Sequence, residues 1–279
     1  MSGGEACRAF LKRQLPKLGY RWEGFRKVHR QVCKRIRRRL AELRIESFTA
    51  YERHLEENEE ERNRLDAMTH ITISRFFRDR RAWDRLEKLH LPALLAEAAG
   101  ESRPFRCWSA GCASGEEPYS FAILWHETLA PSCPGLRLEL IATDADEQLL
   151  ARAQEACYPE GSLKEVPPEW RGRAFRRCAE SPRLFRLREQ YRILPAFLRQ
   201  DVRERCPEGT FDLVFCKNVV AMYMERRLAA RILDRIAGWI RPGGLLVLGS
   251  HEPFPLPQDG PLEPLDPLAR IYRRRRPDS

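Results

Sequence analysis

Hydrophobic residues follow two different spacings along this chain of 279 residues. In the first part, apolar side chains recur every three or four positions between residues 25 and 43, which places them on one face of a helix. From about residue 104, short apolar runs of strand length alternate with longer segments of helical pattern. The pattern predicts a helical N-terminal domain over residues 1–90 and an α/β domain over residues 91–279.

The alternation in the second part predicts individual elements. Strands are expected at 103–109, 136–144, 211–216 and 245–250, and helices at 117–129, 147–156 and 224–240. Residues 241–244 read as a turn, 253–267 as an irregular Pro-rich stretch and 268–274 as a final strand. Alternating strands and helices indicate a mostly parallel, doubly wound sheet, which binds its ligands at the carboxyl ends of the strands.

Composition and charge narrow the class of protein. The chain has no apolar run of the roughly 20 residues that span a bilayer, and its first residues lack the apolar core of a signal peptide, so we expect no membrane insertion and a cytoplasmic protein. Nine cysteines are scattered without a C-x-x-C pair, which argues against a zinc site and predicts reduced, mostly buried thiols. No other metal site is predicted.

Lys and Arg outnumber Asp and Glu by 50 to 40, a net charge of +10 that favours an anionic partner. Much of the excess lies on the helical stretch 25–43, whose polar faces carry Arg26, Lys27, Arg30, Lys34, Arg35, Arg37, Arg38 and Arg39. Aromatic residues for base stacking are not interleaved there, which disfavours nucleic acid. A solvated helix face and a docking surface for an acidic protein both remain open.

The stretch Trp108-Ser-Ala-Gly-Cys-Ala-Ser-Gly-Glu-Glu-Pro-Tyr-Ser joins a predicted strand to a predicted helix through a small-residue loop. Backbone N–H groups at such a helix start suit an anion, whereas Glu117 would repel a triphosphate and pair with an ammonium group. Asp144 ends the next strand, where an acid can accept hydrogen bonds from ribose hydroxyls. An amino acid joined to a nucleoside without phosphate describes S-adenosylmethionine. Alternatively, Glu117 is only a first-turn acid and Asp144 only a helix N-cap.

Four stretches of the chain carry a family resemblance: residues 72–79, 108–120, 142–146, and 211–220 with 241–244. On these motifs the chain resembles the chemotaxis-receptor (CheR-type) methyltransferases, which form glutamyl methyl esters on receptors. The likeness runs over roughly residues 15–275. It implies a class I methyltransferase-like doubly wound sheet of seven strands, a small all-helical N-terminal domain, and S-adenosylmethionine as cofactor, with S-adenosylhomocysteine as product.

The resemblance also implies roles for individual residues. The cofactor-binding positions are Thr72, Ser74, Arg78, Glu117, Asp144, Asp201, Cys216 and Lys217. Arg78 and Tyr223 would flank the methyl-transfer centre, and Arg35, Arg38 and Arg39 would face an acidic protein substrate such as a chemoreceptor-like helix. Residues 159–195 fall where the family inserts a small β-subdomain, with strands expected at 169–171 and 183–191. A monomer is expected.

The expected chemistry needs little from the protein beyond alignment. An ionised glutamate is already a nucleophile, so Arg78 would hold a carboxylate and Tyr223 would orient the attacking oxygen. Packing alone could also explain Tyr223, and an ion pair with Asp79 or Asp84 could explain Arg78. One extra residue between Asn218 and Tyr223, relative to the family pattern, leaves Met222 as a rival for the tyrosine position. Methylation of a small carboxylic acid, of another protein side chain or of RNA, and non-catalytic cofactor binding, remain alternatives.

Overall fold

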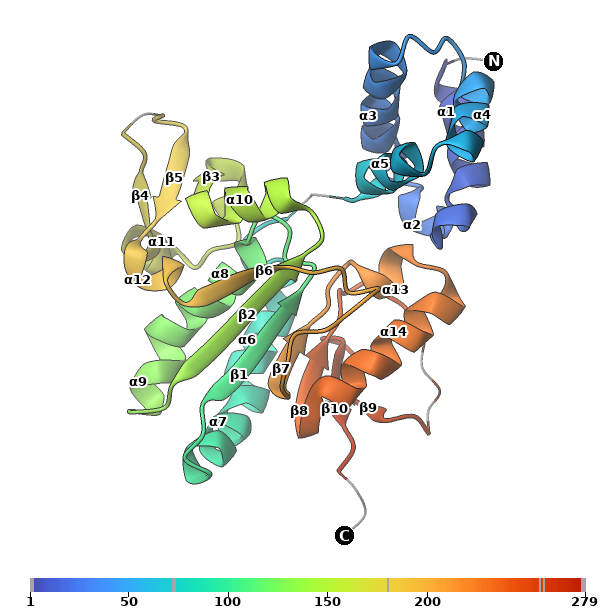
Figure 1. Ribbon diagram of the computed structural model, residues 1–279. Helices are drawn as coiled ribbons and strands as arrows, with labels where there is room; N and C mark the ends of the chain where they lie inside the picture. The colour runs from blue at the N-terminus through green and yellow to red at the C-terminus, as the bar shows by residue number, and fades with distance from the viewer. Residues whose placement is uncertain (1–2, 72–73, 180, 256, 258, 277–279) are drawn as a thin grey trace.

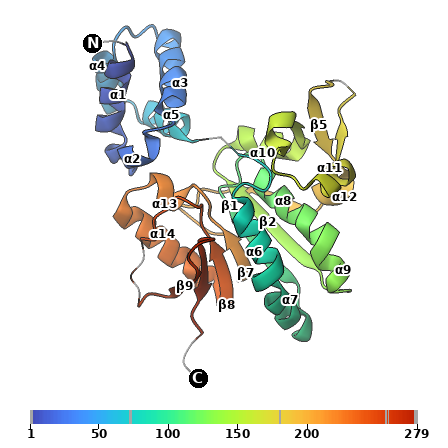
Figure 2. The same cartoon turned by 180° about the vertical axis from the view of Figure 1, so that it is seen from behind.

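The computed structural model describes residues 3–71, 74–179, 181–255, 257 and 259–276. The N-terminal helices form a group of their own at one end of the molecule, above the α/β part (Figures 1 and 2). They are α1 (Gly3–Gln14), α2 (Trp22–Phe25), α3 (His29–Glu42), α4 (Phe48–Glu57) and α5 (Glu59–Thr69), with the short η1 (Pro16–Leu18). Ser47 caps α4 by accepting the N–H of Ala50 at 3.1 Å.

The large sheet has seven strands in the order β6-β2-β1-β7-β8-β10-β9. The five strands from β6 to β8 run parallel, and β10 runs antiparallel to both β8 and β9. The mostly parallel sheet that the sequence pattern predicted, and the seven strands that the resemblance implied, are confirmed. The chain moves outward in one direction from β1 to β6 and in the other from β7 to β8, so the order reverses between β1 and β7. The strands are β1 (Phe105–Ala110), β2 (Leu138–Asp144), β6 (Pro195–Arg199), β7 (Phe211–Phe215), β8 (Ile240–Val247), β9 (Leu262–Asp266) and β10 (Ile271–Arg274).

Two apolar cores cover the two faces of this sheet. One runs from the N-terminal helices through α14 to Trp108, and the other joins the helices after residue 79 to Phe105 and Cys107. Adjacent side chains of β1 therefore enter opposite cores, as the alternation of a strand requires. The remaining helices are α6 (Arg80–Arg85), η2 (Leu86–His90), α7 (Leu91–Gly100), α8 (Glu116–Leu124), η3 (Trp125–Leu129), α9 (Ala130–Ser132), α10 (Glu147–Glu155), η4 (Glu160–Leu163), α11 (Pro168–Ala174), α12 (Glu189–Arg192), α13 (Val220–Tyr223) and α14 (Arg226–Trp239).

Two local predictions about the sheet were wrong. Residues 241–244, predicted as a turn, lie inside β8, where the pairing with β7 jumps from Phe211–Ile240 to Leu213–Leu245. The extra residues are absorbed as an irregularity in which Gly243 takes a φ of +85°. The stretch 253–267, predicted to be irregular, ends in the edge strand β9. Pro264 is compatible with this position because only one side of an edge strand is paired.

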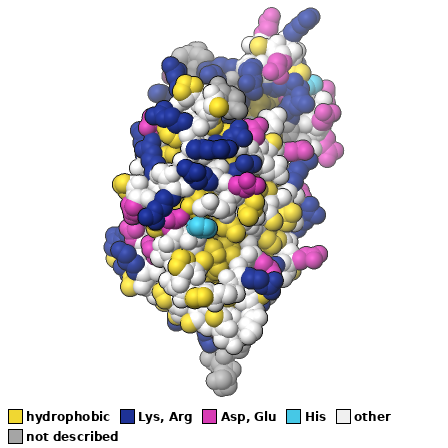
Figure 3. Space-filling model, turned by 90° about the vertical axis from the view of Figure 1, so that its left-hand side faces the viewer, with side chains coloured by type: hydrophobic (Ala, Val, Ile, Leu, Met, Phe, Trp, Pro, Cys, Tyr) yellow, Lys and Arg dark blue, Asp and Glu magenta, His cyan; other side chains and the backbone are white. Residues whose placement is uncertain are grey.

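A second, three-stranded antiparallel sheet lies within the region where the resemblance implied a small subdomain. It consists of β3 (Cys157–Pro159), β5 (Leu184–Leu187) and β4 (Phe175–Arg177), in that order. The strand expected at 169–171 is instead part of α11, which begins at Pro168, a residue suited to the first turn of a helix. Arg171 and Arg177 lie over the ring of Phe185. Figure 3 shows the side of the molecule that lies on the left in Figure 1, where β4 and β5 are, and Lys and Arg side chains gather over its upper half.

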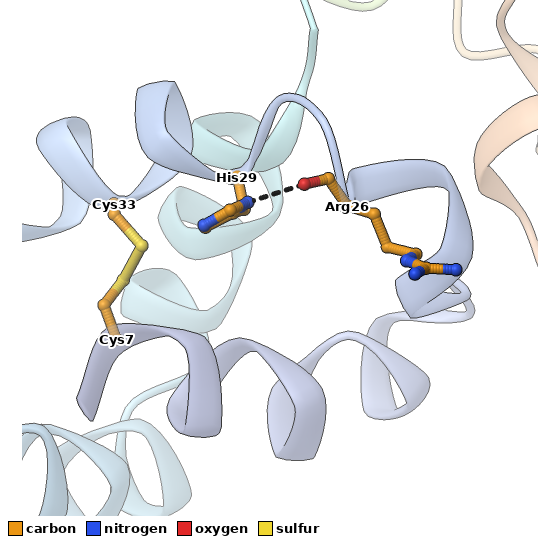
Figure 4. The surroundings of a disulfide bond; sticks show 4 residues. All are labelled: Cys7, Arg26, His29 and Cys33. Atoms are coloured by element: carbon orange, nitrogen blue, oxygen red, sulfur yellow. Dashed lines mark hydrogen bonds between the residues drawn. A yellow bond between two sulfur atoms is a disulfide. The ribbon is translucent and has the colours of Figure 1, made fainter. Parts of the chain in front are cut away.

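The cysteines depart from the prediction of reduced thiols at one pair. Cys7 of α1 and Cys33 of α3 form a disulfide (Figure 4). The two residues are 26 positions apart, and only the packing of α1 against α3 brings them together. The other seven cysteines are free, and Cys107, Cys112, Cys178 and Cys216 are buried. Among the described residues, no helix has the length and apolar character needed to cross a membrane.

Candidate functional site

A cavity lies at the carboxyl ends of β1, β2 and β7, and N-terminal residues close it from the other side. This is the end of the sheet at which the strand order reverses, where open α/β sheets bind their ligands. Thr72 lies outside the described residues. The predicted residues that line the cavity are Ser74, Arg78, Glu117, Asp144, Asp201, Lys217 and Tyr223.

The loop after β1 is shaped by two glycines. Gly111 has a φ of +71°, and a Cβ atom on it would stand 2.4 Å from Val219, so this position excludes any side chain. Gly115 has a φ of +89° and precedes the first turn of α8. The N–H groups of Gly111 and Cys112 donate to the carbonyl of Thr143, which ties the loop to β2. The loop therefore brings backbone close to the cavity at the start of a helix.

Glu117 lies in the first turn of α8 with its carboxylate in the cavity. Ser109 donates to its Oε1 at 2.8 Å, and the Lys217 ammonium lies 3.8 Å from its Oε2 and 3.5 Å from Asp79. Burial raises the pKa of Glu117, and the charge of Lys217 opposes that rise. Two carboxylates thus share one lysine here, which favours a second cation such as a ligand ammonium.

Asp144 ends β2 and points into the cavity. Its two oxygens accept the N–H of Ala113 at 2.8 Å and the N–H of Asp146 at 2.9 Å. The N-cap of α10 is Asp146, which accepts the N–H groups of Gln148 and Leu149, so capping does not explain Asp144. Burial raises the pKa of Asp144, and the two backbone N–H groups oppose the rise. The carboxylate orders the loop and keeps acceptor capacity for a ligand.

Arg78 and Tyr223 come from opposite parts of the chain and line the same cavity. The Arg78 carbonyl accepts from Trp83 at 3.0 Å and from the Lys217 ammonium at 2.8 Å, and its guanidinium donates to Asn218 at 3.4 Å. The suggested partner Asp84 pairs instead with Arg80.

Tyr223 ends α13, and its ring lies 5.1 Å from that of Phe25. Burial raises its pKa, with the charge of Arg78 opposing the rise, so the hydroxyl keeps its proton and can donate. The rival Met222 is not among the described residues that line the cavity, and its carbonyl accepts from Arg21.

Of the remaining predicted residues, some line the cavity and others lie away from it. Ser74 lines the cavity, and a hydrogen bond from its side chain helps to stabilise the charge of Glu116. Cys216 is fully buried in the core behind the cavity wall, while Lys217 beside it lines the cavity. On α3, Arg39 is held by Glu61 at 2.6 Å, and Arg35 donates to the carbonyls of Met68 and His70. Arg38 is exposed, with Glu42 at 3.7 Å.

The structure adds a bridge that the sequence did not indicate. Arg203 pairs with Asp201 on its own loop and with Asp66 of α5, both at 2.6 Å, and donates to the hydroxyl of Tyr20 at 3.2 Å. One guanidinium thereby joins the N-terminal helices to the loop after β6, at the wall of the cavity. An arginine two residues after an aspartate carries no motif, so only the packing identifies this role.

Replacing Arg203 with methionine is expected to weaken S-adenosylhomocysteine binding about tenfold, a loss of about 1.4 kcal/mol, because two carboxylates would lose their shared cation at the cavity wall. Isothermal titration calorimetry measures this. Arg199→Met is the matched control, since Arg199 is an exposed arginine of the same region whose partner is Glu147. Equal affinities of the two variants would contradict a role for the bridge in closing the cavity.

The sequence of this chain is similar to a known family of proteins and to several of its curated members. A protein-family model described as "CheR methyltransferase, SAM binding domain" matches residues 72–265. This chain belongs to the CheR methyltransferase family. It is 30% identical over 229 residues to a chemotaxis protein methyltransferase of Listeria monocytogenes, covering 82% of this chain and 83% of the relative.

Other curated relatives give the same result. Chemotaxis protein methyltransferase 2 of Pseudomonas aeruginosa is 34% identical, covering 80% of this chain and 78% of its own, and the Escherichia coli protein is 32% identical, covering 80% and 76%. Among solved structures, a magnesium protoporphyrin IX methyltransferase from Synechocystis with bound S-adenosylmethionine is 19% identical, covering 57% of this chain and 55% of its own. The TM-score of that comparison is 0.28.

Members of this family are S-adenosylmethionine-dependent methyltransferases, and so is this chain. The residues present fit that cofactor. Glu117 offers a largely buried carboxylate for an ammonium group, Asp144 offers oxygens for ribose hydroxyls, and the turn at Gly111 presents backbone to the cavity. When bound, the cofactor supplies an activated methyl group on a sulfonium.

Proposed function

We propose that this methyltransferase esterifies the carboxylates of glutamate side chains in an acidic, chemoreceptor-like protein segment in the cytoplasm. The observation that carries the proposal is that Arg78 and Tyr223 line the same cavity as Glu117 and Asp144. The names of the curated relatives, chemotaxis protein methyltransferases, support an acceptor in a signalling protein.

In this proposal, each group has a separate task. Glu117 and Asp144 bind the two ends of the cofactor, and Arg78 holds the acceptor carboxylate through its planar fork of N–H donors. The protonated hydroxyl of Tyr223 donates a hydrogen bond that orients the attacking oxygen. No general base is needed, because a glutamate carboxylate is already ionised at neutral pH. Rate acceleration then depends on alignment and on exclusion of water.

Substrate docking on α3 rests on fewer groups than the sequence suggested. Arg35 and Arg39 hold neighbouring parts of the N-terminal helices together, and the exposed cations Lys34 and Arg38 remain candidates to meet an acidic partner. Long-range attraction by such a face speeds encounter and weakens with salt. Because two of the three arginines predicted to face a protein substrate bind groups of the protein itself, a small carboxylic acid is a second candidate acceptor.

The test uses cofactor labelled in the methyl group. Incubated with a purified chemoreceptor cytoplasmic fragment, the enzyme is expected to transfer label that is released as methanol in mild base, because carboxyl methyl esters hydrolyse there. Mass spectrometry of peptides then locates the ester on glutamate. Label that stays on protein or RNA after base treatment would contradict the proposal, and label found only in small molecules would favour the second candidate.

A further inference from the structure

Glu252 is a fully buried carboxylate that none of the roles above uses. It follows β8 and lies beneath the wall of the cavity that carries Lys217, Asn218 and Tyr223. Isolated buried carboxylates are costly unless nearby groups stabilise them, so a fully buried one calls for an explanation.

The partners of Glu252 are backbone groups of the cavity wall. Its Oε2 accepts the N–H of Asn218 at 2.7 Å and the N–H of Gly249 at 2.6 Å. The N–H of Met222, the residue before Tyr223, also stabilises its charge. One carboxylate thus hydrogen-bonds both the loop after β7 and the loop after β8, and the N–H of Met222 brings the end of α13 within reach of its charge.

The segment that Glu252 holds has an unusual conformation. Asn218 has a φ of +56°, a left-handed conformation that glycine and, less often, asparagine or aspartate adopt, and its side chain packs so closely on Gly249 that a Cβ there would stand 2.8 Å away. The same side chain accepts a hydrogen bond from Arg78. The conformation of Asn218 therefore affects where the Arg78 guanidinium points.

We propose that Glu252 is a positioning residue for methyl transfer, which holds Asn218 and the end of α13 so that Arg78 and Tyr223 face the acceptor carboxylate together. The proposal rests on the function proposed above for Arg78 and Tyr223. Glu252 itself is not among the described residues that line the cavity. Its influence passes through Asn218 to Arg78 and through Met222 to Tyr223.

The electrostatics give this positioning a pH dependence. Burial raises the pKa of Glu252 to about 7, opposed by the backbone N–H groups and by the charge of Lys217. Among the described residues, the charge of Glu252 also acts on the Cys216 thiol and the Tyr223 hydroxyl, and burial raises the pKa of both. The ionised carboxylate is the better acceptor for several N–H groups, so positioning strengthens as pH rises through about 7.

Stability changes in the opposite direction. Because the pKa of Glu252 in the folded protein lies above its usual value, the folded state binds a proton that the unfolded chain has already released. This carboxyl therefore lowers stability as pH rises from the usual glutamate range to about 7. Opposite trends in activity and stability, both arising from one residue, separate positioning from a plain structural role.

The experiment compares wild type, Glu252→Gln and Asp212→Asn. Wild-type kcat at saturating cofactor is expected to rise through about pH 7. Glu252→Gln should lose that rise in kcat with pH. Its kcat should be about tenfold below that of wild type near pH 8.5 and similar to it near pH 6. Asp212 is the matched control, a buried carboxylate at the start of β7 that accepts from Arg103 and Arg106. The Asp212→Asn variant should be less stable but keep the rise in kcat through about pH 7.

A second readout does not depend on any acceptor. Amide hydrogen exchange of Asn218 and Gly249 in wild type should show protection that falls below about pH 7, beyond the intrinsic pH dependence of exchange. A flat wild-type profile of kcat, or protection unchanged on protonation, overturns the inference even if Glu252→Gln does not fold. An enzyme that forms no methyl ester but shows this change in protection refutes the proposed function and leaves the positioning intact.

Discussion

Arg78→Ala is expected to lower kcat for methyl transfer by about 100- to 1000-fold, a loss of about 2.7–4 kcal/mol of transition-state stabilisation. The backbone of Arg78 is held by Trp83 and Lys217, and its guanidinium by Asn218, so the donors are oriented before the acceptor arrives. Such preorganised donors cost little reorganisation during reaction. Arg78→Lys keeps the charge but loses the planar fork, so we expect an intermediate rate.

Steady-state kinetics and calorimetry together assign the role of Arg78. Arg80→Ala is the control, because Arg80 is a partly exposed neighbour that pairs with Asp84. A normal kcat at saturating cofactor combined with weak S-adenosylhomocysteine binding would place the guanidinium on the methionine carboxylate instead. Normal values of both would remove Arg78 from the site.

Asp144→Ala is expected to weaken S-adenosylhomocysteine binding about 100-fold, close to 2.7 kcal/mol. The carboxylate offers a charged acceptor for ribose hydroxyls, and hydrogen bonds to charged groups contribute about 1.5–3 kcal/mol. It also holds the N–H of Ala113 in the loop after β1. Asp144→Asn keeps a carbonyl oxygen and loses the charge, so its affinity should lie between those of wild type and the alanine variant.

Calorimetry measures the affinities, and thermal unfolding checks that the loop change has not destabilised the whole domain. Glu147→Gln is the matched control, since Glu147 is an exposed acid three residues away that pairs with Arg199. At saturating cofactor, kcat of Asp144→Ala should stay within about tenfold of wild type, because its role is in binding. Undiminished affinity would contradict the proposed ribose contact.

Parts of the site with a local pattern could be predicted from the sequence. Glu117 comes shortly after a predicted strand and Asp144 ends the next one, which places both at the carboxyl edge of a parallel sheet, and the structure puts both in one cavity. Arg78 and Tyr223 were assigned through the family motifs, and their roles stay predictions until tested. The extra residue before Tyr223 left its position open, and the fold of α13 turns this tyrosine toward the cavity.

Other features depend on contacts between distant segments. Arg203 meets Asp66 across 137 positions, Glu252 meets Asn218 across 34, and Cys7 meets Cys33 across 26. Neither periodicity nor composition marks such pairs. The strand β8 shows the same limit at short range, because Pro-Gly-Gly indicates a turn by propensity, while the pairs that Ile240 and Leu245 make with β7 on either side leave residues 241–244 as an irregularity within the strand.

The sequence by itself determined the class of this protein, the alternation of strands and helices in its second part, and the acids suited to S-adenosylmethionine, because hydrophobic periodicity and strand-end motifs are local properties. Only the tertiary structure decided which arginines of α3 bind internal partners and which lie exposed, since Arg35 and Arg39 are engaged by segments that α3 meets only on packing. It also decided that Glu252 is buried beneath the cavity wall, because side-chain burial depends on the whole fold.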